Sequence, residues 1–241
     1  MNNAIIVCSG GLDSVTTAYY VKKKLKINKI KIIFFDYGQR TLKEEEYCVK
    51  KCANDLNAEF EKVEVKWLGE ISTALLNKKE EIPETTKKDL GDIEKENKEK
   101  IMWWVPCRNS IFLINALAFA ESLFISKNER WDVYIGVKKE GKIPMKDTRP
   151  EFIKSVNDLA EQGTYHGGYK IIAPLIDLDK DEIVKLASEL KVPLEFTYSC
   201  YSGGGFKGKI PKHCGTCANC MDRKMGFYWA GVKDISIYEK D

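Results

Sequence analysis

The stretch AIIVCSGGLDSVTTAYYVKKKLK, residues 4–26, decides how the N-terminal part of this chain folds. It opens with a short apolar run, Ala4–Cys8, which is typical of a buried strand. After Ser14 the apolar residues recur at near-helical spacing. Between the two patterns stands SGGLDS, residues 9–14. Two glycines and two hydroxyl side chains therefore occupy the turn where a strand passes into a helix.

This turn predicts a phosphate-binding site. Gly10 and Gly11 can adopt backbone conformations closed to other residues, so that backbone N–H groups converge on an anion. The following helix, beginning near Asp13, adds its positive N-terminal end, and Ser9 and Ser14 can donate hydroxyl hydrogen bonds. The alternative is a plain glycine turn. The turn matches neither the Walker pattern GxxxxGK[ST] nor the dinucleotide pattern GxGxxG.

Strand-like and helix-like patterns alternate along the chain, which predicts an α/β fold. We expect a Rossmann-like (HUP-type) parallel sheet with helices on both faces. The expected strands are 4–8, 31–35, 60–65 and 132–136; the expected helices are 14–26, 42–57, 110–124, 150–162 with Pro150 in its first turn, and 179–190 with Asp179 as N-cap and Glu182 as its capping-box partner.

Composition bounds the class of protein. The chain has 241 residues, 44% of them hydrophobic, which is enough for a sizeable core. A net charge of +3 argues against a protein that coats nucleic acid. No apolar run approaches the ~20 residues of a membrane span, and the N-terminal residues lack the pattern of a signal peptide. We therefore expect a cytoplasmic protein without a membrane partner.

Four of the eight cysteines crowd the C-terminal part: Cys200, Cys214, Cys217 and Cys220. In a reducing compartment such crowding indicates a metal site, and four thiolates suit a closed, structural Zn²⁺ site. A set in which His213 replaces one cysteine, an iron–sulfur cluster and free thiols are the alternatives. A redox CxxC is disfavoured because two CxxC pairs share Cys217.

We divide the chain into a domain over residues 1–195 and a zinc-binding segment over 196–241 packed on it. The stretch 87–100 is dominated by charged residues. It is either a solvated loop or surface helix, or a mobile lid over the site.

The SGGxDS turn after the first strand resembles the PP-loop of N-type ATP pyrophosphatases, enzymes that break ATP between its α- and β-phosphates. The resemblance implies that the loop binds the leaving pyrophosphate. An ionised Asp13 beside pyrophosphate makes sense mainly through Mg²⁺. The residues assigned to this loop are Ser9, Gly10, Gly11, Leu12, Asp13 and Ser14.

An ordered set of further motifs resembles the 7-cyano-7-deazaguanine synthase family over nearly the whole chain. The motifs are FDYGQR (35–40), VPCRN (105–109), DTRPEF (147–152), APLIDLDKDEI (173–183) and the cysteine segment. The family belongs to deazapurine (queuosine and archaeosine) biosynthesis. It uses ATP and ammonia to convert the carboxylate of 7-carboxy-7-deazaguanine to a nitrile, through an adenylate, an amide and a second adenylate. Relatives often form homodimers.

The resemblance also implies roles for individual residues. Asp36 is expected to bind the ribose or adenine of the nucleotide, and Gln39 and Arg40 the substrate or α-phosphate. Arg108 and Asn109 are expected to contact phosphate. Asp147 and Arg149 position the substrate in this interpretation, or form an ordinary ion pair or cap. Lys146 is a candidate charge for the α-phosphate. Trp103 and Trp104 either stack on a purine or pack in the core.

Two departures from the family bear on function. Cys107 stands where the family has glycine, as a passive small residue or a reactive thiol. The substrate segment over 138–149 keeps little beyond its aspartate and arginine and gains positive charge. A second hypothesis is therefore a paralogue that transfers the activated deazapurine to an amine of a protein or nucleic acid, as in nucleic-acid modification or antiviral defence. A third is a non-catalytic nucleotide-binding protein.

Overall fold

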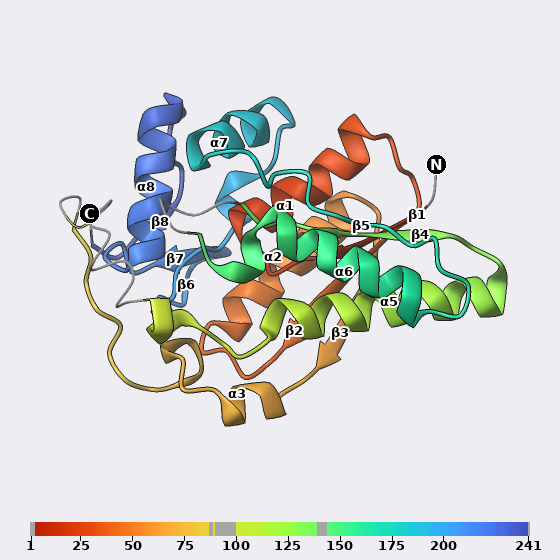
Figure 1. Ribbon diagram of the computed structural model, residues 1–241. Coiled ribbons are helices and arrows are strands. Elements are labelled where there is room, and N and C mark those ends of the chain that lie inside the picture. Colours follow the sequence, from red (N-terminus) through yellow and green to blue (C-terminus); the bar gives the residue numbers. More distant parts are fainter. Residues whose placement is uncertain (1–2, 87–88, 90–99, 139–143, 241) are drawn as a thin grey trace.

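The computed structural model describes residues 3–86, 89, 100–138 and 144–240. Its centre is a five-stranded, wholly parallel sheet in the order β3-β2-β1-β4-β5, with helices on both faces (Figure 1). The predicted α/β class is confirmed. The strands are β1 (Asn3–Val7), β2 (Ile30–Asp36), β3 (Glu59–Glu64), β4 (Trp131–Ile135) and β5 (Ile171–Ile172).

The five predicted helices are all present, with ends that differ by a few residues. The first, α1, passes directly into a π-helical turn over Tyr20–Lys24, so together they span the expected helix. The last, α7, has the predicted capping box between Asp179 and Glu182. The bounds are α1 (Leu12–Tyr19), α2 (Leu42–Asp55), α5 (Arg108–Lys127), α6 (Pro150–Gly163) and α7 (Lys180–Glu189); the sequence did not predict α3 (Trp67–Ile71).

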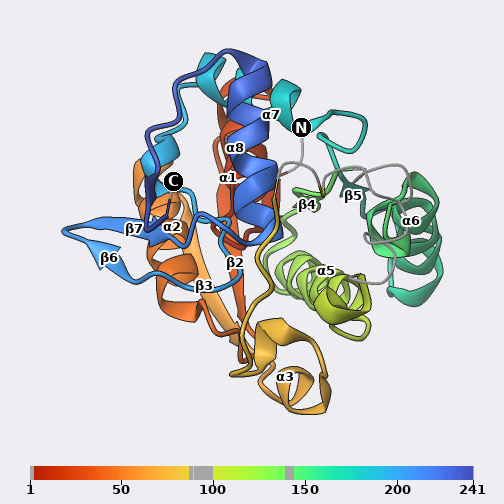
Figure 2. The same ribbon diagram turned by 90° about the vertical axis from the view of Figure 1, so that its left-hand side faces the viewer.

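Two apolar layers hold the helices on the sheet, because successive side chains of each strand point to opposite faces. Ile6 and Ile32 face the layer formed with α1, α2 and α7. Ile5 and Ile33 face the layer formed with α3, α5 and α6. The long helices α5 and α6 lie on the other side of the sheet from α1 and α2 (Figure 2). All four isoleucines are fully buried.

The longest helix, α5, is the only part of the described chain long and apolar enough to cross a membrane by length and composition. In this fold it packs against β1 and β4, and its buried side includes Leu113, Ala116 and Leu117. This core position accounts for the apolar residues on the buried side of the helix.

Residues 196–240 add a small second sheet and one further helix, which we call the C-terminal unit. An antiparallel hairpin of β6 (Phe206–Lys207) and β7 (Ile210–His213) is joined by β8 (Ile237–Tyr238), which runs parallel to β7. Helix α8 (Ala218–Ala230) packs against α7, and its Phe227 enters the core layer beside α1 and α7 (Figures 1 and 2). The boundary near residue 195 stays a prediction. Of the charged stretch 87–100, all but Asp89 and Lys100 lies outside the described residues.

Cys107 precedes α5 in a left-handed conformation, with φ of 53° and ψ of 20°. A side chain costs about 1–2 kcal/mol in this region, whereas glycine adopts it freely. This explains why the resembled family has glycine here. The thiol itself is exposed.

We expect Cys107→Gly to raise the free energy of unfolding by about 1 kcal/mol, because glycine relieves the left-handed strain. Urea unfolding followed by circular dichroism measures the change. Cys107→Ala keeps the Cβ atom and serves as the control; equal stability of the glycine and alanine variants would contradict the backbone explanation.

Candidate active site

The candidate site lies at the carboxyl ends of β1 and β4, where the order of the strands in the sheet reverses. From β1 the chain proceeds outward to β2 and β3, and then returns to place β4 on the other side of β1. Ligands of open α/β sheets bind at the carboxyl ends of strands at such a switch point. At this point Gly136, just after β4, approaches the start of α1 so closely that a Cβ atom on it would lie 2.6 Å from Ser14 Cα and 2.7 Å from the Asp13 carbonyl oxygen. The loops after β1 and β4 therefore form one surface.

The predicted phosphate loop has the geometry of an anion site. Gly10 has φ of +81°, and a Cβ atom there would lie 2.6 Å from the carbonyl oxygen of Glu45. Ser14 Oγ accepts a hydrogen bond from the Ser9 backbone N–H at 3.2 Å and lies 3.2 Å from Ser9 Oγ. Gly11 is the N-cap of α1 and makes no side-chain cap, so the first N–H groups of α1 lack an intrahelical partner. They are free to bind anionic oxygens at the positive end of the helix.

Lys180 is a functional candidate that the sequence analysis missed. Its ammonium group lies 3.0 Å from each carboxylate oxygen of Asp13 and 3.3 Å from Asp222 Oδ2. The side chain passes so close to α8 that a Cβ atom on Gly226 would lie 2.4 Å from Lys180 Cγ. A signal was present in the sequence. Lys180 is the first residue of α7, where the helix dipole disfavours a positive charge, so a specific partner was to be expected.

Asp222 on α8 lies between Lys180 and a second lysine, Lys138, which follows β4. The Asp222 Oδ2 atom is 3.9 Å from Lys138 Nζ. Burial alone would raise the pKa of Asp222, but the ammonium groups of Lys180 and Lys138 outweigh burial and hold this pKa below its ordinary value. Asp13, Lys180, Asp222 and Lys138 thus alternate in charge at the edge of the cavity.

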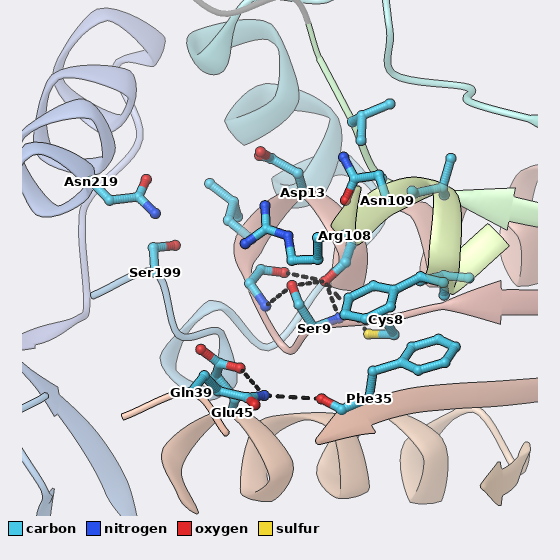
Figure 3. A pocket seen from close by; sticks show the side chains of 18 of the residues that line it. Cys8, Ser9, Asp13, Phe35, Gln39, Glu45, Arg108, Asn109, Ser199 and Asn219 are labelled. Carbon is cyan, nitrogen blue, oxygen red and sulfur yellow. Dashed lines mark hydrogen bonds between the residues drawn. The ribbon is translucent and has the colours of Figure 1, made fainter. Parts of the chain in front are cut away.

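Aromatic side chains form the opposite wall of the cavity. Phe35 and Phe112 stack with ring centroids 4.1 Å apart, and Trp103 lies 4.7 Å from the ring of Tyr201. Trp103 is buried and lines the cavity while packing in this cluster. Such a wall suits a flat heterocycle. Figure 3 draws the side chains of 18 of the residues that line the cavity.

Arg108, Asn109 and Asp147 come together in this cavity, as the motifs suggested. Arg108 lies over the ring of Tyr37 at 5.7 Å and donates a 3.5 Å hydrogen bond to the Tyr37 hydroxyl. Asn109 Nδ2 donates to the Asp147 carbonyl oxygen at 3.3 Å, which ties α5 to the short turn over 146–148. Burial raises the pKa of Asp147, and the nearby Arg108 opposes this effect.

Gln39 and Glu45 form the floor of the cavity beside the phosphate loop (Figure 3). Gln39 Nε2 donates to the Phe35 carbonyl oxygen and to Glu45 Oε2, both at 3.0 Å. Thr41 Oγ1 donates to Glu45 Oε1 at 2.6 Å. Burial raises the pKa of Glu45 to about 7, although the Thr41 and Gln39 hydrogen bonds and Arg108 oppose the shift.

Four other predicted residues are not among those that line the cavity. Asp36 pairs with Lys62 at 3.3 Å and with Lys66 at 3.9 Å. Arg40 donates to the Glu80 carbonyl oxygen at 2.8 Å. The remaining two flank Asp147 in the chain: Lys146 is exposed, and Arg149 donates two hydrogen bonds to the Pro144 carbonyl oxygen.

The four predicted metal ligands converge in the C-terminal unit. The Sγ atoms of Cys200, Cys214, Cys217 and Cys220 all lie within 4.8 Å of one another, and the Cys214 and Cys220 sulfurs are 3.8 Å apart. A tetrahedral ion with bonds of about 2.3 Å to sulfur has edges of about 3.8 Å, so the cluster fits a single such ion.

His213 is placed outside this ligand set. Its Nε2 accepts a hydrogen bond from the Ser199 backbone N–H at 3.2 Å, and its ring lies between Tyr198 and Tyr238. Burial lowers its pKa well below the ordinary value, so the imidazole is neutral. It therefore packs beneath the cysteine cluster without joining it.

The cysteine cluster also borders one edge of the cavity. Cys217 is the N-cap of α8, so a metal ion held by this residue would fix where the helix begins. One turn of that helix carries Asn219, which lines the cavity, and Asp222, which pairs with Lys180. Tyr198 and Ser199, just before Cys200, line the cavity too.

Comparison with known proteins agrees with the motif set. Residues 3–231 match the family described as queuosine biosynthesis protein QueC. The chain belongs to this family. Relatives named 7-cyano-7-deazaguanine synthase are 39% identical in Methanococcus maripaludis, 37% in Methanobrevibacter smithii and 38% in Methanocaldococcus jannaschii, each alignment covering 98% of both chains.

Similarity to solved structures is weaker. A 4-thiouridine synthetase in complex with RNA and ATP has a TM-score of 0.49 and 17% identity, covering 95% of this chain and 50% of that one. At this level the similarity supports no conclusion about what the QueC-family chain binds.

Glu45 makes the stability of the fold depend on pH. Burial raises the pKa of Glu45 from its ordinary value of 4.5, which applies to the unfolded chain, to about 7 in the folded chain. Between these values the folded chain keeps a proton that the unfolded chain has lost, so the free energy of unfolding falls as pH rises. We expect Glu45→Gln to flatten this part of the profile, measured by urea midpoints across the same range. Glu70→Gln, at an exposed position of α3, is the control. A variant profile as steep as that of the unaltered protein would contradict the assignment.

Loss of the metal should loosen α8 and the cavity edge together. We expect Cys220→Ser to lower the bound metal well below one ion per chain and to lower the unfolding temperature, because the ion closes the cluster at the start of α8. Elemental analysis and calorimetry measure both effects. Cys107→Ser, at the exposed cysteine, should change neither; full metal content in the Cys220 variant would refute the ligand set.

Proposed function

We propose that this QueC-family enzyme is an ATP-dependent ligase that makes 7-cyano-7-deazaguanine from 7-carboxy-7-deazaguanine and ammonia, releasing AMP and pyrophosphate. Full-length similarity to relatives named for this product supports the proposal. The structural observation that carries it is the uncapped start of α1, with Ser9 and Ser14 beside it, opening into a cavity with an aromatic wall.

In this proposal the β- and γ-phosphates of ATP bind to the loop over residues 9–14 and to the first N–H groups of α1. Lys180 and Arg108 lie along the same cavity and neutralise charge that develops as pyrophosphate departs. Electrostatic stabilisation is the main contribution a protein can make to phosphoryl and nucleotidyl transfer.

The reaction requires two rounds of adenylation. A carboxylate oxygen of the substrate attacks the α-phosphorus and pyrophosphate leaves. Ammonia then attacks the acyl carbon, AMP leaves, and one proton is released as the amide forms. The amide oxygen attacks the α-phosphorus of a second ATP and again displaces pyrophosphate. Loss of the N–H protons and of AMP, which carries the oxygen away, leaves the nitrile. One site serves both rounds because both attack the same phosphorus.

The metal sites have different proposed roles. Zn²⁺ at the four thiolates would hold the C-terminal unit and the start of α8, without contact to the reacting atoms. Mg²⁺ would enter with ATP and neutralise its phosphates. Asp13 has Lys180 as a cationic partner, so it tolerates nearby phosphate without requiring a metal ion for that purpose.

One observation supports the second candidate function, transfer of the activated deazapurine to an amine of a macromolecule. Lys138 begins the substrate segment over 138–149, which differs from the family pattern. Lys138 lines the cavity, whereas Lys146 and Arg149 of the same segment do not. This segment is the one expected to recognise the deazapurine. A homodimer in the cytoplasm remains our expectation for either function.

The decisive assay incubates the purified protein with Mg²⁺, ATP, 7-carboxy-7-deazaguanine and ammonium, and follows AMP by chromatography and products by mass spectrometry. Free nitrile, with two AMP per product, supports the synthase. AMP release with a mass increase only on a macromolecule supports transfer to another amine. Failure to release AMP with the acid and any amine refutes both.

Ser14→Ala should reduce AMP release by about 10- to 100-fold, because the hydroxyl both orders the loop through Ser9 and donates to the leaving phosphate. The variant should retain its metal and its unfolding temperature. Ser155→Ala, at an exposed serine of α6, is the matched control. Unchanged AMP release in Ser14→Ala would remove the phosphate loop from the mechanism.

A further inference from the structure

Lys138 is a buried lysine that faces the active-site cavity. It stands three residues beyond the end of β4, and its side chain is 7% exposed. It lines the cavity together with Asp13 and Lys180 of the charge chain. Lysines are rarely buried to this extent unless their charge is paired.

The pairing of Lys138 is incomplete within the described residues. Its one ion-pair partner there is Asp222, at 3.9 Å, beyond hydrogen-bond distance. Asp222 Oδ2 lies closer to Lys180, at 3.3 Å. An ammonium group has three donors, and leaving them unmet in a buried place costs free energy. A bound ligand would supply the partners that the fold does not give to the ammonium group of Lys138.

The ligand of this ammonium is an anion, and the two candidates on the reaction path are a phosphate and a carboxylate. The phosphates already have the loop over residues 9–14, the start of α1 and Lys180. Lys138 follows β4, whereas the phosphate loop follows β1. The chain after Lys138 leads on to Asp147, which also lines the cavity. This position is beside the phosphate loop but outside it, so of the two anions the carboxylate of the acid is the one left for this ammonium group.

We propose that Lys138 binds the carboxylate of the acid that is to be adenylated and holds it against the α-phosphate. This inference rests on the proposed function and names a substrate-binding residue for it. In the absence of ligand, Asp222 supplies the carboxylate that Lys138 faces. The substrate carboxylate offers a closer partner than Asp222, which is held chiefly by Lys180. After adenylation the acyl oxygen loses its negative charge, so the hold of Lys138 on it weakens before ammonia attacks.

Binding of the two anions can be separated by calorimetric titration. In one arm, 7-carboxy-7-deazaguanine is titrated into protein saturated with α,β-methylene-ATP, which cannot release pyrophosphate. In the other, the nucleotide analogue with Mg²⁺ is titrated alone. We expect Lys138→Met to weaken acid binding by about 10- to 100-fold, the usual loss for a hydrogen bond to a charged group, and to change nucleotide binding by less than about 2-fold. Lys138→Arg, which retains the charge, should recover part of the acid affinity.

Two controls separate this role from a structural one. Lys154→Gln, at a lysine whose side chain is 80% exposed, should leave both arms unchanged. Lys138→Met and the smaller change Lys138→Gln should not lower the unfolding temperature, because a buried, incompletely paired charge is removed. If the fold needed the Lys138–Asp222 ion pair, both variants would have a lower unfolding temperature than the unaltered protein.

The outcomes are distinct. Unchanged acid binding in both neutral variants overturns the inference alone. A loss confined to the nucleotide arm assigns Lys138 to phosphate and overturns it as well. If the unaltered protein binds the nucleotide but not the acid, the proposed function fails, and the inference fails with it.

Discussion

The charge chain Asp13–Lys180–Asp222–Lys138 is the interaction on which the arrangement of the site depends. Its members come from the start of α1, the start of α7, α8 and the loop after β4, so four separate segments are held in one place. Lys180 is buried and lies within 3.3 Å of both aspartates, so removing it would leave two carboxylates without their nearest cation. The phosphate loop is positioned by this network as much as by its own glycines.

The same network explains why a metal cluster belongs in a nucleotide-dependent enzyme. Asp222 lies only two residues beyond Cys220, and Cys217 begins the helix that carries both. An ion held by the four cysteines would fix the start of this helix, which carries Asp222. Asp222 in turn pairs with Lys180 and faces Lys138. A structural metal can therefore act on the catalytic cavity without contacting any reacting group. The close approach of Gly226 to the stem of Lys180 makes the contact between α8 and α7 too tight to shift independently.

Periodicity predicted the four long strands and five of the six longer helices of the described chain, because each of these buries an apolar face of regular spacing. It missed β5, which has two residues and no period, and α8, which begins within the cysteine cluster. Convergence of the loop, Arg108, Asn109 and Asp147 followed from parallel topology. Lys138 and Lys180 were missed because one lysine resembles another along a sequence, and their partners are distant in the chain. Asp36 was expected to face a nucleotide, but Lys62 lies on the neighbouring strand, and this pairing is visible only in three dimensions.

Features that lower stability gather around the cavity. Cys107 holds a left-handed conformation that glycine would adopt without strain, Glu45 is a carboxyl whose burial disfavours its charge, and Lys138 is an ammonium with too few partners. Residues that break the local rules of folding are expected at functional sites, where another requirement outweighs stability. For Lys138 that requirement is an incoming anion. For Glu45 it is the turn through Gln39 and Thr41, which closes the cavity floor beneath the phosphate loop. Among the described residues the exposed thiol of Cys107 has no partner in the cavity. We therefore interpret cysteine at this position, just before α5, as a substitution that the fold tolerates and that takes no part in the chemistry.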